Sequence, residues 1–269
     1  MANPITISNT SLAQSLIGKI GNSQATTASS LSKLSTGLLV SKASDNAAAL
    51  SIISGMNSEV RGLNQATRNT NDAISMTQIA DGGMQSINEA QQRIRELSVQ
   101  ASNGTLNDSD RASLQLEVDQ LQSQISDTIA NTEFNGKQVL ASSETVAVQT
   151  GPNAGDSTNI ALTDYSASFT NVDISTQAGA QSAITSIDAD METATDAQAK
   201  FGAVQNGLES TASNLASMAE SISAARSRIE DLDVASETAK LASSQIRDQF
   251  SVSTLAQSGQ YNRNILDLL

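Results

Sequence analysis

Residues 201–232 read FGAVQNGLESTASNLASMAESISAARSRIEDL, and their apolar residues recur at alternating spacings of three and four. One set of positions holds Phe201, Leu208, Leu215, Ile222 and Ile229, and the other holds Val204, Thr211, Met218, Ala225 and Leu232. Such heptad spacing places a narrow apolar stripe along one side of a helix. A single helix cannot bury its own stripe. The stretch therefore predicts a long helix that needs partner helices, from its own chain or from neighbouring copies.

Both ends of the chain continue this pattern in a weaker form. After Leu232 the heptad register continues through Ala239, Ile246 and Phe250, diluted by serines. In the first 44 residues, apolar residues recur at Leu12, Leu16, Ile20, Leu31, Leu34 and Leu38, and fifteen residues are Ser or Thr, which compete with helical hydrogen bonding. We expect weak terminal helices that are disordered in the free monomer and pair with each other, because each has a stripe and no other partner.

The middle of the chain predicts two further helices and a hairpin. One helix of about 57 residues begins near Ser44 or Asp45, and its stripe shifts phase by one residue at Gly82-Gly83. A third helix, capped by Asn107, Asp108 or Ser109, returns antiparallel to it. Residues 145–162 alternate like two strands around a loop rich in turn formers. Helical pattern resumes near Ala178, with a break near Thr195.

The predicted fold class is mainly α. It is a long, coiled-coil-like helical rod with paired N- and C-terminal helices and a small β-hairpin region in the middle. We expect an inner domain of residues 1–44 with 231–269, and an outer rod domain of residues 45–230 that includes the hairpin at about 145–162.

Composition excludes several classes of function. The chain has 269 residues, no Cys, no His and a net charge of −13. Residues 45–230 hold 9 basic and 23 acidic residues, which argues against binding a nucleic-acid backbone. The absence of Cys excludes thiolate chemistry, and the absence of His removes the commonest acid–base group and metal ligand. No apolar run approaches membrane-spanning length, and the amino-terminal residues lack the pattern of a cleaved signal peptide. We therefore expect no enzyme, no cofactor, no metal and no contact with nucleic acid or membrane.

Five motifs resemble those of bacterial flagellin, in the same order and at similar distances from both ends. They are KLSTGL at 33–38, ATRNTNDAIS at 66–75, QQRIRELSVQ at 91–100, FNG at 134–136 and ARSRIED at 225–231. The resemblance covers roughly residues 1–140 and 178–269. The chain departs from the family in its short middle, which lacks large outer domains. It departs also in its last nine residues, YNRNILDLL.

The resemblance implies a structural subunit that self-assembles into the extracellular flagellar filament and is exported by the flagellar type III route without a cleaved signal. It implies as partners other flagellin subunits, an export chaperone at the C-terminal region, and the filament cap and hook-junction proteins. The expected self-assembly residues are Leu31, Leu34, Leu38, Ile246, Phe250, Leu255, Ile265, Leu266 and Leu269.

The family resemblance also implies a contact with the innate immune receptor Toll-like receptor 5. The matching residues here are Arg93, Leu97 and Glu117. Arg93 and Leu97 are four residues apart and share one helix face. The alternative interpretation is that Leu97 belongs to the apolar stripe and that Arg93 and Glu117 form an ordinary surface pair.

Two other functions are compatible with these observations. A hook–filament junction protein shares the amino-terminal pattern, although the ARSRIED motif favours flagellin. A flagellin-like cell-surface adhesin or binding protein is a different class, and it would need pocket residues in a larger central domain.

Overall fold

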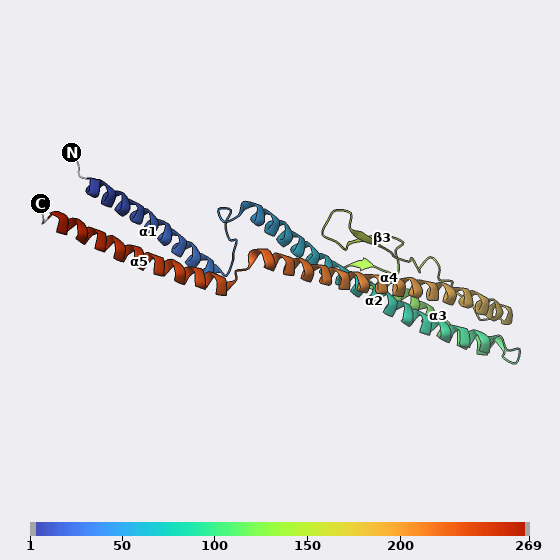
Figure 1. Cartoon of the computed structure of the whole chain (residues 1–269). Coiled ribbons are helices and arrows are strands. Elements are labelled where there is room, and N and C mark those ends of the chain that lie inside the picture. The colour runs from blue at the N-terminus through green and yellow to red at the C-terminus, as the bar shows by residue number, and fades with distance from the viewer. Residues whose placement is uncertain (1–3, 267–269) are drawn as a thin grey trace. The chain divides into compact units, whose positions relative to one another are not determined.

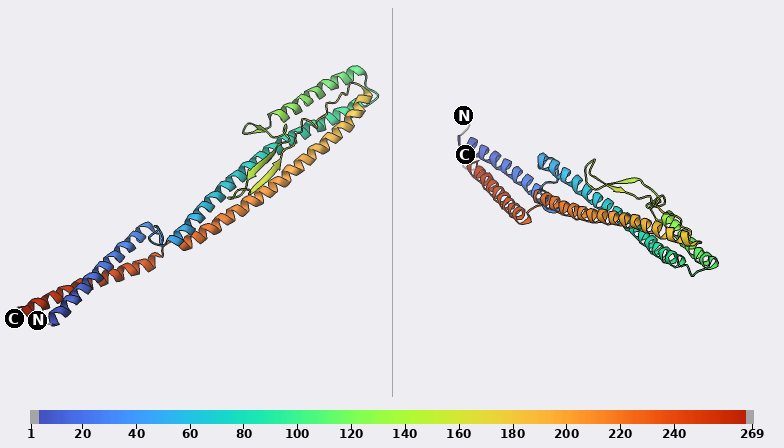
Figure 2. Two further views of the ribbon diagram at one scale, coloured as in Figure 1. Left: turned by 90° about the horizontal axis from the view of Figure 1, so that it is seen from above. Right: turned by 90° about the vertical axis from the view of Figure 1, so that its right-hand side faces the viewer.

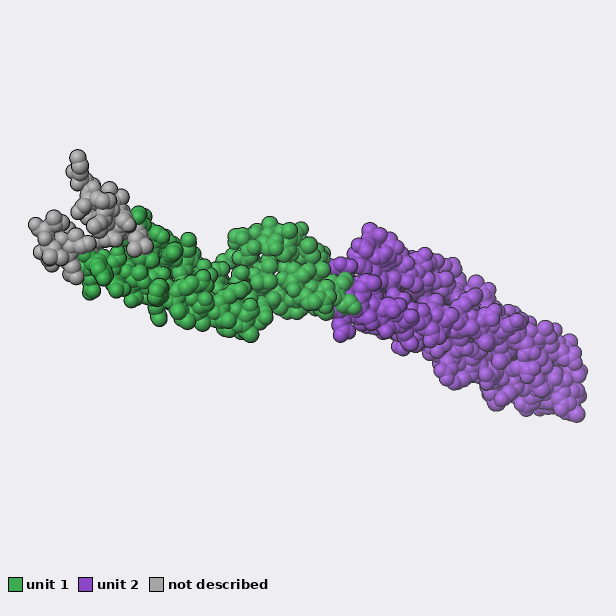
Figure 3. All heavy atoms as spheres, in the orientation of Figure 1, with its two compact units in different colours: residues 1–58, 221–269 green, residues 59–220 purple. Residues whose placement is uncertain are grey.

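The computed structural model describes residues 4–266 and is mainly helical, which confirms the predicted fold class (Figure 1). Its elements follow the order α1 Pro4–Thr36, α2 Ala47–Ala101, α3 Asp108–Asn131, β1 Glu133–Phe134, β2 Lys137–Gln138, β3 Thr145–Gln149, β4 Ser157–Ala161, α4 Gln177–Glu230 and α5 Val234–Leu266. Two compact units result, coloured separately in Figure 3: residues 1–58 with 221–269, and residues 59–220. We call them the terminal unit and the central unit.

In the terminal unit α1 and α5 lie side by side and antiparallel in every view (Figures 1 and 2). This confirms the predicted pairing of the terminal helices. The residues that face each other follow heptad spacing in both helices and form what we call the seam. On α1 these are Leu16, Ile20, Ser23, Thr27, Ser30 and Leu34, and on α5 they are Glu237, Leu241, Ser244, Asp248, Ser251 and Leu255. The middle of the seam is therefore polar.

The predicted continuation of the 201–232 stripe into α5 is wrong. Ala239 is exposed, and Ile246 and Phe250 are 66% and 72% exposed, because α5 turns a different side toward α1. The helix itself stops at Glu230, and Asp231 pairs with Leu38 in an isolated antiparallel bridge. This interruption changes the rotational phase of the helix that follows.

The central unit packs α2, α3 and α4 around one apolar core, with the hairpins against it. Along α2, buried residues keep an unbroken 3,4 spacing from Leu63 to Ala101, at Leu63, Ala66, Thr70, Ala73, Thr77, Ala80, Met84, Ile87, Gln91, Ile94, Ser98 and Ala101. The predicted phase slip is therefore wrong. Ala90 and Leu97, which suggested it, form a second buried line beside the first. A helix with neighbours on two sides needs this wider buried face.

Gly83 allows close packing against α2 and does not shift the 3,4 spacing of the buried residues. A Cβ atom there would lie 2.8 Å from Thr132 Oγ1 and 2.9 Å from Leu140 Cδ1, so the glycine lets the segment after α3 approach α2 closely. The predicted break near Thr195 is also absent, because α4 is continuous.

The predicted hairpin is confirmed as β3 and β4, which pair antiparallel from Thr145 with Ala161 to Gln149 with Ser157. The NTEFNGKQVL stretch, expected as a turn, contains a second small hairpin of β1 and β2. Its turn residues Asn135 and Gly136 have φ values of 51° and 76°, a left-handed pair that suits Asn-Gly.

The helix starts are set by asparagine side chains. Asn107 caps α3 in a reciprocal capping box with Asp110, and it was one of the three residues predicted to cap this helix. For α2, however, Asn46 Oδ1 accepts from the Ala49 amide at 3.1 Å. Ser44 or Asp45 was expected to cap this helix, but Asp45 instead accepts from the amides of Ser41 and Lys42.

Candidate assembly surfaces

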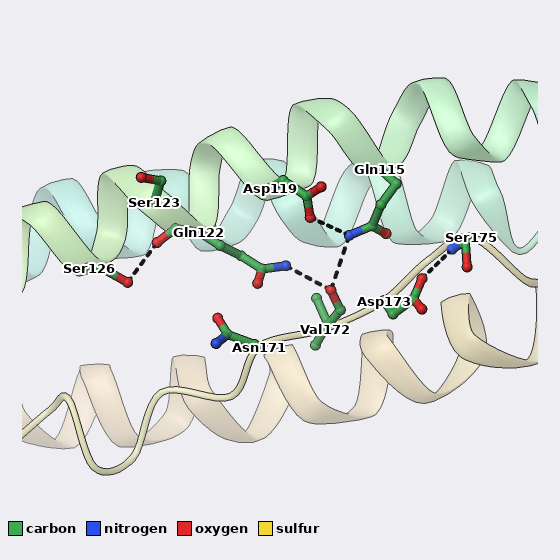
Figure 4. A pocket seen from close by; sticks show the side chains of 9 residues that line it. All are labelled: Gln115, Asp119, Gln122, Ser123, Ser126, Asn171, Val172, Asp173 and Ser175. Atoms are coloured by element: carbon green, nitrogen blue, oxygen red, sulfur yellow. Dashed lines mark hydrogen bonds between the residues drawn. The ribbon is translucent and has the colours of Figure 1, made fainter.

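The central unit has a surface groove of about 650 Å³ between α3 and residues 171–175 (Figure 4). Amide side chains of α3 cross it: Gln122 Nε2 donates to the Val172 carbonyl at 2.8 Å, and Gln115 Oε1 accepts from the Ile174 amide at 2.6 Å. These bonds satisfy the backbone of a segment that has no strand partner. The groove therefore has a structural role, because its glutamine side chains hold residues 171–175 against α3.

A series of buried hydrogen bonds holds residues 162–176, the connecting segment between β4 and α4, against α2 and α4. Tyr165 is fully buried, accepts from Gln91 Nε2 at 2.6 Å and donates to the Asp190 carbonyl at 2.9 Å. Burial raises the pKa of Tyr165 to about 12, so the phenol stays protonated and can donate. The Asp190 carboxylate, 5% exposed, accepts from the amide of Thr170 at 2.9 Å. Burial raises the pKa of Asp190 despite this bond.

No metal site accompanies these groups: across residues 4–266, no three carboxylates lie close enough to hold an ion. In the same range no helix is long and apolar enough to cross a membrane.

The expected self-assembly residues divide into two groups. Leu31, Ile246 and Phe250 are 60%, 66% and 72% exposed, so their side chains are available to a neighbouring molecule. Leu34 and Leu255 are half-buried in the seam, and Leu38 is half-buried beside the bridge to Asp231. The side chains of Ile265 and Leu266, and the whole of Leu269, lie outside the described residues.

On the paired terminal helices, four further exposed apolar residues escaped the sequence prediction. Ile17 is 52%, Val234 54%, Val252 53% and Tyr261 63% exposed. Each was overlooked because it lies off the apolar stripe that the spacing emphasised. Because the middle of the seam is polar, several large apolar side chains of α1 and α5 face outward. Exposed apolar surface of this kind marks interaction sites.

Hydroxyl groups and one carboxylate hold the seam together. Ser23 Oγ donates to the Ser244 carbonyl at 2.9 Å, and Thr27 Oγ1 donates to Ser244 Oγ at 3.1 Å. Ser30 Oγ donates to Glu237 Oε1 at 2.6 Å, and Glu237 is only 4% exposed. The Ser30 hydrogen bond, reinforced by Lys240, lowers the pKa of Glu237 against the opposing effect of burial. Such a seam buries little apolar surface and stabilises the pair weakly.

The residues expected at the receptor contact do not share one surface. Arg93 on α2 and Glu117 on α3 form a half-exposed ion pair of 2.8 Å, and Arg93 also contacts Glu96 at 2.9 Å. Leu97 is 1% exposed and belongs to the core. Only the two charged residues therefore present side chains to a partner, while Leu97 packs beneath them.

Comparison with known proteins gives matches at both ends of the chain. Residues 7–145 match the bacterial flagellin N-terminal helical region, and residues 184–269 match the bacterial flagellin C-terminal helical region. The chain is 38% identical over 156 residues to the phase 1 flagellin of Salmonella naestved, covering 58% of this chain and 31% of that protein. It is 32% identical over 167 residues to the flagellin of Salmonella muenchen, covering 62% and 33%. The chain thus spans about a third of the length of these curated relatives.

Two solved structures resemble the chain. The crystal structure of Bacillus cereus flagellin matches with a TM-score of 0.52 and 30% identity, covering 55% of this chain and 88% of that one. A putative flagellar hook-associated protein from Vibrio parahaemolyticus matches with a TM-score of 0.62 over 70% of this chain and all of that one. At 14% identity, this second match is a likeness of fold alone.

Proposed function

This chain belongs to the bacterial flagellin family, and we propose that it is the structural subunit of the flagellar filament, acting in motility by self-assembly and not by catalysis. The observation that carries the proposal is the outward-facing apolar set Ile17, Leu31, Ile246, Phe250 and Tyr261 on the paired terminal helices. A polar seam leaves this surface unburied in a single chain. Neighbouring copies in a filament would bury it, and apolar burial drives association.

The terminal helices form the inner, assembly-dependent part of the subunit. We place this part at residues 1–44 with 231–269, and the outer rod at 45–230. The interruption of the helix after Glu230 and the bridge between Leu38 and Asp231 support a boundary there. In the free monomer the inner part is disordered, because its seam buries little apolar surface, and it orders on assembly.

We extend the proposal to the export route and the remaining partners, with family membership as its support. The subunit leaves the cell by the flagellar type III route, without a cleaved signal, and is added at the filament tip beneath the cap protein. An export chaperone holds the C-terminal region before export, and a hook-junction protein joins the filament to the hook. In animals, Toll-like receptor 5 contacts the exposed Arg93–Glu117 pair.

Seeded polymerisation tests this function against the two alternatives. Purified chain mixed with short filament fragments should grow long filaments, visible by negative-stain electron microscopy. A hook–filament junction protein would bind fragment ends without extending them. A cell-surface adhesin would remain soluble. Either of these two results would overturn the proposal.

A further inference from the structure

The two sides of the α1–α5 pair carry opposite charges. On one side a groove of about 460 Å³ contains Lys19 from α1 and Arg247 from α5, with Phe250 at its rim. We call it the basic groove. Neither cation forms an ion pair with a carboxylate anywhere in the described part of the chain. Among the described residues, the Arg247 guanidinium donates only to the carbonyl and hydroxyl of Ser243. Two positive charges therefore converge on a groove that contains no negative one.

The opposite side of the pair has a groove of about 690 Å³ that contains Asp248, with Val252 at its rim. We call it the acidic groove. Asp248 Oδ1 is buried and finds no hydrogen-bond donor among the described residues. An ionised oxygen in this position is unfavourable unless a donor or cation reaches it.

Helix geometry places these two grooves on opposite sides of the pair. Ser244 and Ser251 point at α1 in the seam, and successive residues of a helix are 100° apart. Arg247 therefore projects to one side of the seam line, and Asp248 lies at the edge of the seam on the other side. On α1, Lys19 lines the basic groove and Thr27 the acidic one. The two grooves overlap in level along α5, since the basic groove is lined by residues between 244 and 251 and the acidic groove by residues between 245 and 253.

We propose that α1–α5 pairs of neighbouring copies stack side by side, with Asp248 of one copy facing Lys19 and Arg247 of the next. This inference rests on the proposed function and names the contact that builds the filament. The charges are complementary, and each groove carries an exposed apolar residue that the neighbour would cover: Phe250 at 72% and Val252 at 53%. Because the two surfaces are different, the contact is head-to-tail, and a head-to-tail contact builds an open filament when its rotation does not close a ring.

Charge reversal on each side provides the test. Arg247→Glu places a carboxylate beside the remaining Lys19, so the basic groove loses its net positive charge, and Asp248→Arg gives a copy with two basic surfaces. We expect each variant alone to raise the critical concentration at least about tenfold in a sedimentation assay at low salt, while wild type polymerises. An equimolar mixture should polymerise in alternation. In the mixture the introduced glutamate of one variant meets the introduced arginine of the other at one contact. At the next contact the unchanged Asp248 meets the unchanged Lys19 and Arg247.

Matched controls separate this contact from a general effect of charge. Lys42→Glu changes the net charge as Arg247→Glu does but lies on the exposed loop before α2, so it should polymerise like wild type. Mixed with Asp248→Arg, it restores the mean charge without restoring the contact, and Asp248→Arg should stay in the supernatant. Circular dichroism should show both groove variants folded in the central unit.

Each possible result bears on the inference. If wild type forms filaments and the single variants do so equally well, the side-by-side contact is wrong and the filament function stands. If folded single variants fail and their mixture also fails, the two grooves do not face each other. If wild type itself forms no filament, the proposed function falls and this inference falls with it.

Discussion

Ser30 and Glu237 meet inside the seam, where the serine hydroxyl donates a 2.6 Å hydrogen bond to the carboxylate. One residue lies on the first helix and the other on the last, 207 positions away. Together with Lys240, this contact holds the pKa of Glu237 below its ordinary value of 4.5, so the bond favours the ionised form. A group of this kind contributes stability that is fully present above 4.5 and is lost as the pH falls through the lowered folded-state pKa.

Filament stability should therefore depend on pH partly through Glu237. In Glu237→Gln the side chain still accepts from Ser30, but its contribution no longer changes with pH. We expect variant filaments to be less stable than wild type at pH 7 and to approach wild type as the pH falls well below 4.5. The measurement is the pelletable fraction of preformed filaments between pH 7 and 2. Two curves that stay parallel over this range would contradict the role of Glu237.

The terminal helices should be the parts of the monomer most open to protease. The seam buries Ser30, Glu237 and Ser244 where a stable coiled coil would bury Leu or Ile. Limited proteolysis of the monomer, followed by mass spectrometry, should remove both ends and leave a core near residues 45–230. The same ends should survive in filaments. Ends that resist protease equally in both states would show that the pair is already stable in the free chain.

Phe250→Ala should weaken polymerisation without weakening the monomer. The ring is 72% exposed in the single chain, so its loss leaves no cavity there. If neighbours bury it fully, truncation costs about 3 to 5 kcal/mol in the filament, which corresponds to a rise of roughly two to four orders of magnitude in critical concentration. Phe201→Ala is the matched control. Its ring is 2% exposed, so that change should lower the melting temperature of the monomer. An unchanged critical concentration for Phe250→Ala would contradict burial of this ring.

The seam also shows which part of the fold could not be predicted from sequence. Heptad spacing correctly identified the long helices and the pairing of the two ends. It failed on which faces pair, because it weighted Ile246 and Phe250 by their hydrophobicity and passed over Ser244 and Ser30. In a subunit with exposed assembly surfaces, apolar residues need not face the chain's own core. Sequence alone does not distinguish burial by the chain itself from burial by neighbours.

The central unit illustrates a second limit. The apparent phase slip in α2 arose because polar core positions such as Thr77 and Gln91 were not counted as buried. Thr77 satisfies its hydroxyl locally through the Ile74 carbonyl, and Gln91 bonds Tyr165 from the distant connecting segment. The local bond is a general option for threonine in helices. The Tyr165 contact depends on the tertiary fold, which spacing does not reveal.

Asp190→Asn should stabilise the central unit at neutral pH. Burial raises the pKa of the carboxyl group above its ordinary 3.8, so the ionised form is disfavoured in the fold. For wild type, stability is therefore gained as the pH falls through the raised folded-state pKa. Asparagine removes the charge while its amide oxygen can still accept from the Thr170 amide. We expect a melting temperature a few degrees higher than wild type at pH 7 and a smaller difference below pH 4. A lower melting temperature at pH 7 would mean that the charged hydrogen bond outweighs burial.

The receptor contact is most sharply tested at Arg93, whose guanidinium lies half-exposed between Glu117 and Glu96. Arg93→Ala should reduce activation of Toll-like receptor 5 reporter cells by monomer at least about tenfold, the loss expected if the contact is worth about 1.4 kcal/mol. Arg95→Ala is the matched control, because Arg95 lies two residues away, is similarly exposed and pairs instead with Asp188 on α4. Leu97→Ala cannot serve, since emptying this buried position costs about 2 to 5 kcal/mol of stability and would confuse unfolding with lost contact. Equal activation by both arginine variants would show that the family's receptor contact does not extend to Arg93.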